Sequence, residues 1–268
     1  MSNKGQIRPV PRIKALPKPV YARPESWGSE GSITEWHTHT WGQFSYVSFG
    51  VLHVDTAQVS YVSPPSYGIW IPANVEHKVS SHVAAEMRSL YIDTLLLDGE
   101  RWTSPFICTV TPLCRELIVR FCQNPVDYQV ASKEARLVDI LLDELRAQPS
   151  VALELPQAND PRVVQICRLL RSNPNNGQDI NQLGSVVGLS GRSVSRLFKR
   201  QTGLTFQQWR QRLRLSLALT WLEAGKSVTE VAMDCGYDSL SAFVVAFKQH
   251  FGQTPGNMFK LQKSSADS

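Results

Sequence analysis

The feature that most constrains this chain is a repeat in its C-terminal third. Residues 188–199 run GLSGRSVSRLFK and residues 236–248 run GYDSLSAFVVAFK, so the second copy carries one extra residue. Each copy is followed by a glycine and a threonine, Gly203 and Thr205 in the first and, 49 residues later, Gly252 and Thr254 in the second. Each copy is typical of an apolar helix, a glycine-containing turn and a second helix, which together form a helix-turn-helix.

Charge is unevenly divided along the 268 residues. The whole chain carries +5, but residues from 156 onward carry +7 and residues 1–155 carry −2. A basic half beside a slightly acidic half indicates one domain that faces nucleic acid and one that does not. A chain of this length can hold two ordinary domains, each with its own core.

Cysteine usage and hydropathy predict a cytoplasmic protein. The five cysteines form no CxxC pair and show no spacing typical of disulfides, so we expect small core residues in a reducing compartment. The N-terminus has no apolar segment typical of a signal peptide, and no apolar run approaches the roughly 20 residues of a membrane helix. We therefore expect no membrane partner.

The N-terminal half is predicted to be rich in short strands. Residues 1–28 are polar and contain five prolines, which favours an extended arm or a disordered tail. Short runs of β type follow at residues 44–49, 51–55, 58–63, 68–71, 78–80 and 87–92. Many short strands at close spacing indicate a small barrel or sandwich.

Two amphipathic helices are expected after the strands, at residues 111–123 and 132–147. Leu137, Leu141 and Leu145 form one stripe of the second helix, with Val138 and Leu142 beside it. This stripe could pack onto the strand-rich domain or form the interface of a homodimer. Residues 149–159 contain two prolines and little periodicity, so we expect them to link the two domains.

The first helix-turn-helix presents a polar helix face. Residues 191–201 are predicted to form its second helix, whose outward positions are Arg192, Ser195, Arg196 and Lys199. An arginine guanidinium can bind guanine O6 and N7 through two parallel hydrogen bonds, and a serine adapts to a donor or an acceptor. We interpret Arg192, Ser195 and Arg196 as contacts to DNA bases and Lys199 as a contact to phosphate.

A single long helix is predicted between the two units, beginning after Thr205. Three arginines, Arg210, Arg212 and Arg214, crowd one stretch of it. We expect Arg210 and Arg214 to contact DNA phosphates, which adds salt-dependent affinity without sequence information. Lys248, in the second unit, is expected to contact phosphate as well.

The second helix-turn-helix repeats the scaffold but not the polar face. Its outward positions are Leu240, Ser241, Val244 and Val245. Such a surface can touch thymine methyl groups but cannot donate paired hydrogen bonds to a base. We therefore predict that Ser241, Val244 and Val245 contact bases but discriminate weakly, and that the first unit supplies most of the sequence discrimination.

The C-terminal sequence resembles a known family. Residues 231–243, VAMDCGYDSLSAF, and residues 247–255, FKQHFGQTP, resemble the signature of AraC/XylS-family transcription regulators, and the resemblance extends over residues 160 to about 260. It implies two helix-turn-helix units with recognition helices in adjacent major grooves of double-stranded DNA, and activation through contacts with RNA polymerase. Many family members carry a basic residue at the position of Val245, so this chain departs from the pattern there.

A second resemblance lies in the N-terminal half, where histidines recur at short spacing. His37 and His39 share one face of a strand because they are two residues apart, and Gln43 follows four residues later. His77 ends a second motif, PANVEH at residues 72–77. These motifs resemble those of the cupin fold, which supply His, His, Glu and then His to a metal, although Gln43 stands in place of the Glu and Asn74 replaces a glycine. The resemblance covers about residues 31–93 and implies a cupin-like β-barrel that acts as a sensor domain.

The histidines support two interpretations. Three imidazoles, from His37, His39 and His77, suit a divalent metal such as zinc. Alternatively, a small effector binds directly in a pocket without a metal. We predict that such a pocket is lined by His37, His39, Trp41, Gln43, Trp70 and His77.

The chain is thus expected to have an α+β two-domain fold. The predicted parts are an arm (1–28), a cupin-like β-barrel with two flanking helices (29–148), a linker (149–159), an all-α domain with two helix-turn-helix units joined by a linker helix (160–262) and a tail (263–268). We expect a transcription regulator rather than an enzyme, controlled by a small effector, with DNA, RNA polymerase and a second copy of the chain as partners. The alternative is a cupin-type metalloenzyme with an appended DNA-binding domain. It is less favoured because the carboxylate ligand is missing and no general acid–base pair is evident in the motifs.

Overall fold

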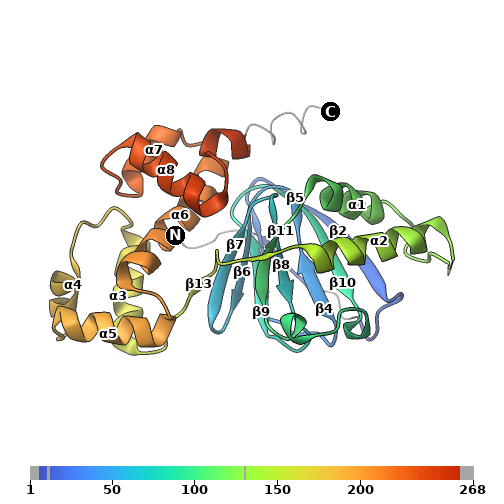
Figure 1. Cartoon of the computed structure of the whole chain (residues 1–268), viewed down its shortest axis with the longest axis horizontal. Coiled ribbons are helices and arrows are strands. Elements are labelled where there is room, and N and C mark those ends of the chain that lie inside the picture. The colour runs from blue at the N-terminus through green and yellow to red at the C-terminus, as the bar shows by residue number, and fades with distance from the viewer. Residues whose placement is uncertain (1–5, 11–12, 130, 260–268) are drawn as a thin grey trace. The chain divides into compact units, whose positions relative to one another are not determined.

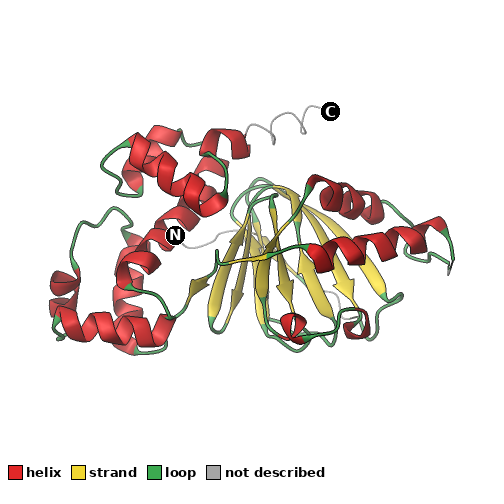
Figure 2. Cartoon of the chain, viewed as in Figure 1, coloured by secondary structure: helices red, strands yellow, loops and turns green. Residues whose placement is uncertain are grey.

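The computed structural model describes residues 6–10, 13–129 and 131–259. Contacts divide the chain into two units, one with residues up to 57 and 61–152, the other with residues 58–60 and those from 153 onward. The first is built mainly of strands and the second mainly of helices (Figures 1 and 2). The expected order, a strand-rich region followed by a helical one, is therefore confirmed. The predicted tail at residues 263–268 lies outside the described residues.

The strands form two sheets. One has the order β1-β3-β9-β6-β7-β13 and the other the order β12-β11-β8-β4-β10-β2, with β5 also paired to β10. Within the described part of the chain these sheets are not joined into a closed barrel, so the expected barrel is seen only as a pair of sheets. The strands are β1 (Gln6–Arg8), β2 (Val20–Trp27), β3 (Ser32–Thr34), β4 (Gly42–Ser45), β5 (Val47–Phe49), β6 (Leu52–Thr56), β7 (Val59–Ser63), β8 (Tyr67–Ile71), β9 (His77–Ser81), β10 (Ala85–Ile92), β11 (Phe106–Thr109), β12 (Ser150–Val151) and β13 (Leu155–Pro156).

The prediction of an extended arm or disordered tail at residues 1–28 is wrong where this segment forms strands, namely β1, which pairs with β3, and β2. All eight residues of β2 pair with β10, from Val20 opposite Ile92 to Trp27 opposite Ala85. The prolines suggested an arm because proline cannot donate a sheet hydrogen bond. Pro24 is tolerated because β2 lies at the edge of its sheet, where one side of the strand has no neighbouring strand among the described residues.

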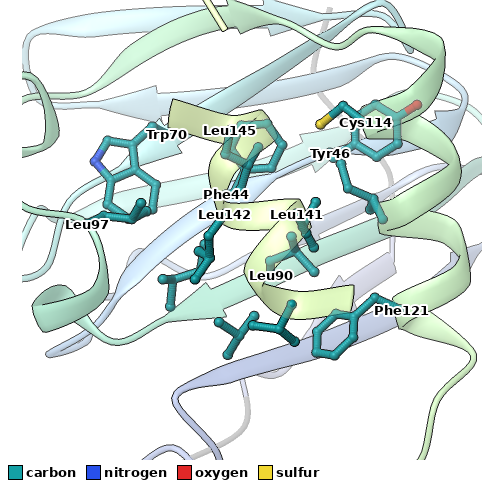
Figure 3. Close-up of a cluster of buried hydrophobic side chains, with 14 of the residues drawn as sticks. Phe44, Tyr46, Trp70, Leu90, Leu97, Cys114, Phe121, Leu141, Leu142 and Leu145 are labelled. Carbon is teal, nitrogen blue, oxygen red and sulfur yellow. The ribbon is translucent and has the colours of Figure 1, made fainter. Parts of the chain in front are cut away.

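The second sheet carries different side chains on its two faces. Phe44 on β4 lies opposite Trp70 on β8 and Leu90 on β10, and all three belong to one apolar core. Gln43 and Ser45 flank Phe44 and point to the other face, because successive side chains of a strand alternate. Figure 3 shows the apolar side gathered beneath a helix that contributes Leu141, Leu142 and Leu145.

Two helices cover this apolar face. α1 (Pro112–Cys122) begins after Thr111, and α2 (Lys133–Ala147) begins after Ser132, and each of these two side chains accepts a hydrogen bond from a backbone N–H of the first turn. The buried residues of α2 are Val138, Leu141, Leu142 and Leu145. The predicted stripe therefore packs onto the sheet, and it is not free to form the homodimer interface that was the alternative.

The helical unit explains why particular residues recur in the repeat. α5 and α8 both end at a glycine with positive φ, Gly203 at 70° and Gly252 at 74°, a conformation that glycine adopts without strain. Asp179, Thr205 and Ser227 each begin a helix with a reciprocal capping box. The helices are α3 (Pro161–Ser172), α4 (Ile180–Val186), α5 (Gly191–Thr202), α6 (Phe206–Glu223), α7 (Val228–Asp234) and α8 (Leu240–Phe251).

The predicted linker at residues 149–159 is more ordered than expected. It contains β12, which pairs with β11, and β13, which pairs with β7. The indole Nε1 of Trp209 on α6 donates to the carbonyl oxygen of Pro156 at 2.8 Å, and Arg212 donates to that of Glu154 at 2.9 Å. The chain from Leu153 onward is thus packed with the helical unit.

Two further expectations concern hydropathy and cysteines. Among the described residues, no helix combines the length and the apolar character needed to cross a membrane. All five cysteines are free and four are buried. Burial raises the pKa of the Cys108 thiol to about 12, so this side chain stays protonated as a small core residue.

Candidate functional site

Helix α5 presents the face that the sequence predicts for DNA contact. Arg192, Ser195 and Arg196 are exposed, whereas Val194 and Phe198 on the other side of the helix are buried. The exposed and buried faces of this helix are therefore those that the sequence predicts. Its exposed face offers two guanidinium groups and a hydroxyl, a set that can form hydrogen bonds with base edges.

Two glycines let α4 and α5 pack closely. A Cβ atom on Gly191 would lie 2.0 Å from Oδ1 of Asn181, and one on Gly184 would lie 2.5 Å from the carbonyl oxygen of Leu189. Ser190 caps α5, since its side chain accepts a hydrogen bond from a backbone N–H of the first turn. The turn before α5 is therefore tightly fixed, and so is the direction in which its exposed face points.

Helix α8 presents a different surface at the equivalent positions. Ser241 is exposed, Val244 is half-buried, and Leu240 and Val245 leave 43% and 55% of their surface exposed. Residues 240–247 include no arginine, lysine, asparagine or glutamine. This surface can make apolar contacts with thymine methyl groups but cannot form paired hydrogen bonds with a base.

The two lysines predicted to contact phosphate lie in the last turns of their helices. Lys199 on α5 and Lys248 on α8 are both exposed. The ammonium group of Lys199 donates to the carbonyl oxygen of Gly203, where it also complements the negative end of the helix dipole. Both side chains are accessible to a phosphate group.

Arg210 and Arg214 do not lie where the phosphate interpretation requires. Arg210 is buried, and its guanidinium donates to the carbonyl oxygen of Gln178 at 2.9 Å. Arg214 is half-buried and donates to the carbonyl oxygens of Pro174, at 2.9 Å, and Gly236, at 3.1 Å. Burial lowers the pKa of both guanidinium groups. The sequence could not reveal this, because it does not show which carbonyl groups the fold brings to these arginines.

The three histidines of the N-terminal motifs come together. Their ring centroids lie 6.0 Å apart for His37 and His39, 4.3 Å for His37 and His77, and 5.0 Å for His39 and His77. One ring nitrogen of each lies within 4.8 Å of the other two. Backbone hydrogen bonds of 3.0 and 2.9 Å between His37 and His77 hold the two motifs side by side.

Hydrogen bonds orient each imidazole. In all three, Nδ1 lies 2.7–2.9 Å from a backbone carbonyl oxygen two residues away. A carbonyl oxygen only accepts, so Nδ1 of His37 and of His77 carries the proton and Nε2 carries the lone pair. Nε2 of His77 is buried and has no hydrogen-bond partner among the described residues. Burial lowers the pKa of all three imidazoles, that of His77 to about 3, which favours the neutral form that binds a metal.

Gln43 lies beside the cluster. Its Oε1 is 3.1 Å from Nε2 of His39, and its Nε2 donates to Oγ of Ser45 at 2.7 Å. The side chain is buried. A neutral amide oxygen therefore faces His39 at the position where the cupin motif has a carboxylate.

A small cavity adjoins the cluster. Its lining includes His37 and Gln43, and its volume of about 20 Å³ has room for about one water molecule. Residues of β2, β3, β9 and β10 complete the lining. There the Arg23 guanidinium donates to the Tyr91 hydroxyl at 2.8 Å and pairs with Glu25. Sequence reasoning missed Arg23 and Glu25 because their segment was expected to be an arm.

The two tryptophans predicted to line the pocket lie on different faces. Trp41 stacks on His39, with ring centroids 5.2 Å apart and planes within 5° of parallel. Trp70 belongs to the apolar core, where its Nε1 donates to the carbonyl oxygen of Trp102 at 2.9 Å. It pairs in register with Phe44, whose side chain faces the helices. The assignment of Trp70 to the pocket is therefore wrong.

Comparisons with known proteins bear on most of the chain. Residues 183–260 match the family described as a helix-turn-helix domain. The HTH-type transcriptional regulator NimR of Escherichia coli (strain K12) is 33% identical over 232 residues, which cover 85% of this chain and 83% of NimR. The chain belongs to the AraC/XylS family of transcription regulators. It is a DNA-binding transcription regulator, as the sequence predicted.

Other similar proteins match shorter parts of the chain or match it more weakly. RipA of Corynebacterium glutamicum is 32% identical over 101 residues, which cover 38% of this chain and 30% of RipA. Among solved structures, ToxT from Vibrio cholerae covers 90% of this chain and 98% of its own at 12% identity, with a TM-score of 0.38.

Proposed function

We propose that this regulator contacts two successive major-groove segments of DNA through α5 and α8, and that α5 makes most of the base-specific contacts. The proposal is carried by the difference between the equivalent exposed positions of the two helices. Guanidinium groups can bind guanine through two hydrogen bonds, whereas valine offers only apolar contact. The positions compared are Arg192, Ser195 and Arg196 on α5 and Ser241, Val244 and Val245 on α8.

The length of α6 supports a two-segment arrangement. Its 18 residues span about 27 Å at the rise of an α-helix, close to the roughly 34 Å that separate equivalent positions one DNA turn apart. Lys199 and Lys248 are the proposed phosphate contacts, because both are exposed. Arg210 and Arg214 are left out, because backbone carbonyl groups already accept their hydrogen bonds.

Selection of DNA from a random-sequence library by the full chain, followed by hydroxyl-radical footprinting, tests this proposal. We expect the selected duplex, called the selected operator below, to show two protected segments about one helical turn apart. Protection of a single segment would contradict the proposal.

We further propose that the strand-rich unit controls the regulator by binding a small effector at the histidine cluster. The adjoining cavity of about 20 Å³ suits an ion or a small polar group. Pockets for organic ligands usually measure about 300–1,000 Å³, so a larger effector would need the cavity to open. The effector would act on transcription because it binds one state of the protein more tightly than another and so shifts the equilibrium between them.

The donor set at this cluster fits a divalent transition metal. Three neutral imidazoles are ligands that zinc, copper, nickel and iron accept, and Nε2 of His77 is buried without a partner among the described residues. His37, His39 and His77 would hold the ion, with Gln43 beside them. A bound divalent ion would supply positive charge and would link the two histidine motifs.

Elemental analysis of the purified chain tests the metal directly. We expect about one divalent ion per wild-type chain, and less than about a tenth of that in His77→Ala, because the variant loses one of three ligands. His82→Ala is the matched control, because His82 is an exposed histidine outside the cluster. Metal contents that are equally low in the wild type and in His77→Ala would contradict the proposal and leave an organic effector.

We also propose RNA polymerase and a second copy of the chain as partners, as the family resemblance implies. A homodimer would use surfaces other than the stripe of α2, which is buried in the core. A catalytic role for the histidine cluster stays the alternative, and turnover of a substrate by the metal-loaded chain would support it.

A further inference from the structure

Arg214 connects parts of the helical unit that are far apart in sequence. Its Nε donates to the carbonyl oxygen of Pro174 at 2.9 Å, and its Nη1 donates to that of Gly236 at 3.1 Å. Pro174 lies between α3 and α4, in the loop that leads into the first helix-turn-helix, and Gly236 lies in the turn between α7 and α8. One guanidinium on α6 therefore holds both helix-turn-helix units to the helix that joins them.

Gly236 allows this contact because it has no side chain. Its φ is 72°, and a Cβ atom there would lie 2.6 Å from Nη2 of Arg214 and 2.8 Å from Cα of Asn175. The turn of the second unit thus lies directly against the loop that precedes the first unit. The equivalent Gly188 has a similar φ of 69°, but no atom in the described part of the chain lies within 4 Å of a Cβ atom built on it. The backbone conformation is shared by both turns, whereas of these two glycines only Gly236 has the close contact.

Neighbouring contacts stabilise the same joint, the place where α6 meets the loop between α3 and α4 and the turn between α7 and α8. Arg210 donates to the carbonyl oxygen of Gln178, in the loop between α3 and α4, at 2.9 Å. The Cys235 thiol donates to the carbonyl oxygen of Arg214 at 3.2 Å, and the Arg214 guanidinium lies 6.0 Å from the centre of the Tyr237 ring. Arginine suits this position because its planar guanidinium can donate to two carbonyl groups at once, whereas a lysine ammonium is a single point.

We propose that Arg214 is a positioning residue that fixes α5 and α8 relative to each other, and so sets which separation between two DNA segments the regulator accepts. This inference rests on the proposed function, in which both helices contact DNA. A rigid joint makes binding sensitive to the phase of the DNA, because one added base pair turns the second segment by about 34° and moves it by about 3.4 Å. With a looser joint the second unit could follow the displaced segment, and the loss of affinity would be smaller.

The test uses the full chain and the selected operator with one base pair inserted or removed between the two protected segments. We expect the wild type to lose about tenfold in affinity on either altered duplex. Arg214→Met keeps much of the side-chain volume but removes the donors, and we expect its loss on the altered duplexes to be about threefold or less. Arg214→Lys should resemble Arg214→Met, because one ammonium cannot replace the planar contact with two carbonyl groups.

Two glycine variants provide a second, matched test. Gly236→Ala disturbs the joint from the opposite side and should also reduce the spacing dependence. Gly188→Ala carries the same backbone strain but has open space around its Cβ atom, so it should keep the wild-type spacing dependence. A duplex with only the segment bound by α5 checks folding, and each variant that binds it as tightly as the wild type is suitable for the comparison.

Two outcomes would overturn the inference, and they are distinguishable. If variants that bind the single segment normally still lose about tenfold on the altered duplexes, Arg214 does not set the spacing. If the wild type binds the single segment as tightly as the full operator, the proposed two-segment function fails, and this inference fails with it. If Arg214→Met does not bind the single segment, the comparison of Gly236→Ala with Gly188→Ala tests the inference in its place.

Discussion

Arg196→Ala is expected to weaken binding to the selected operator by about 1–3 kcal/mol, or about 5- to 150-fold, and to relax the base preference at one position. Arg196 is exposed on the face of α5 that the sequence assigns to base contact. Removing its guanidinium removes a paired hydrogen bond that one base accepts and the others do not. Gel-shift titrations against the operator and its single-base variants measure both the loss and the relaxed preference.

Val245→Ala is the matched control, because Val245 occupies the equivalent position of α8 and is exposed. Its truncation removes only apolar contact, so we expect a loss below about 1 kcal/mol with little change in base preference. If Val245→Ala weakened binding as much as Arg196→Ala, the proposal that α5 makes most of the base-specific contacts would be wrong.

Trp209→Ala is expected to lower the free energy of unfolding of the helical unit by about 3–5 kcal/mol. Trp209 is fully buried, its ring lies 5.5 Å from that of Phe198, and its Nε1 donates to the carbonyl oxygen of Pro156. Truncation leaves a large cavity and an unpaired carbonyl group. Because Phe198 belongs to α5, the cavity opens directly behind the helix proposed to contact bases.

Trp221→Ala is the control for this second prediction. Trp221 lies on the same helix but is only half-buried, with the Lys226 ammonium 5.0 Å from its ring centre. We expect Trp221→Ala to lower the free energy of unfolding by less than half as much as Trp209→Ala, because less apolar surface returns to water. Urea unfolding followed by circular dichroism compares the two variants, and equal losses would show that Trp209 is not the centre of this core.

Much of the helical unit could be predicted from the sequence because its signals are local. Helix caps, apolar spacing and the glycines that end helices depend on neighbouring residues, and the repeat displays each of them twice. The exposed faces of α5 and α8 follow from the same spacing. The strands of residues 42–92 were predicted for a similar reason, since each is a short β-type run bounded by turns.

The features that could not be predicted depend on distant contacts. β2 is a strand only because β10 pairs with it, and nothing within its own sequence outweighs its proline. Arg210 and Arg214 have the sequence of a basic helix surface, but their partners come from loops 22 to 40 residues away. The sequence also did not show which face of the sheet Trp70 occupies, because that depends on the pairing register with Phe44.

The candidate histidine site could be predicted from the sequence only in part. The spacing of His37 and His39 and the separate motif ending at His77 predicted a cluster, and the structure brings the three rings together. The small size of the adjoining cavity was not predictable, because it depends on how Arg23 and Tyr91 fill the space between the sheets.

Our central claim is that α5 contacts guanine through arginine while α8 contacts thymine methyl groups and the DNA backbone. Methylation of guanine N7 blocks an atom that Arg192 and Arg196 would bind. We therefore expect methylated guanines to inhibit wild-type binding in the segment whose base preference Arg196→Ala relaxes, and to be tolerated in the other segment. Inhibition that is equal in both segments, or absent from both, would contradict the claim.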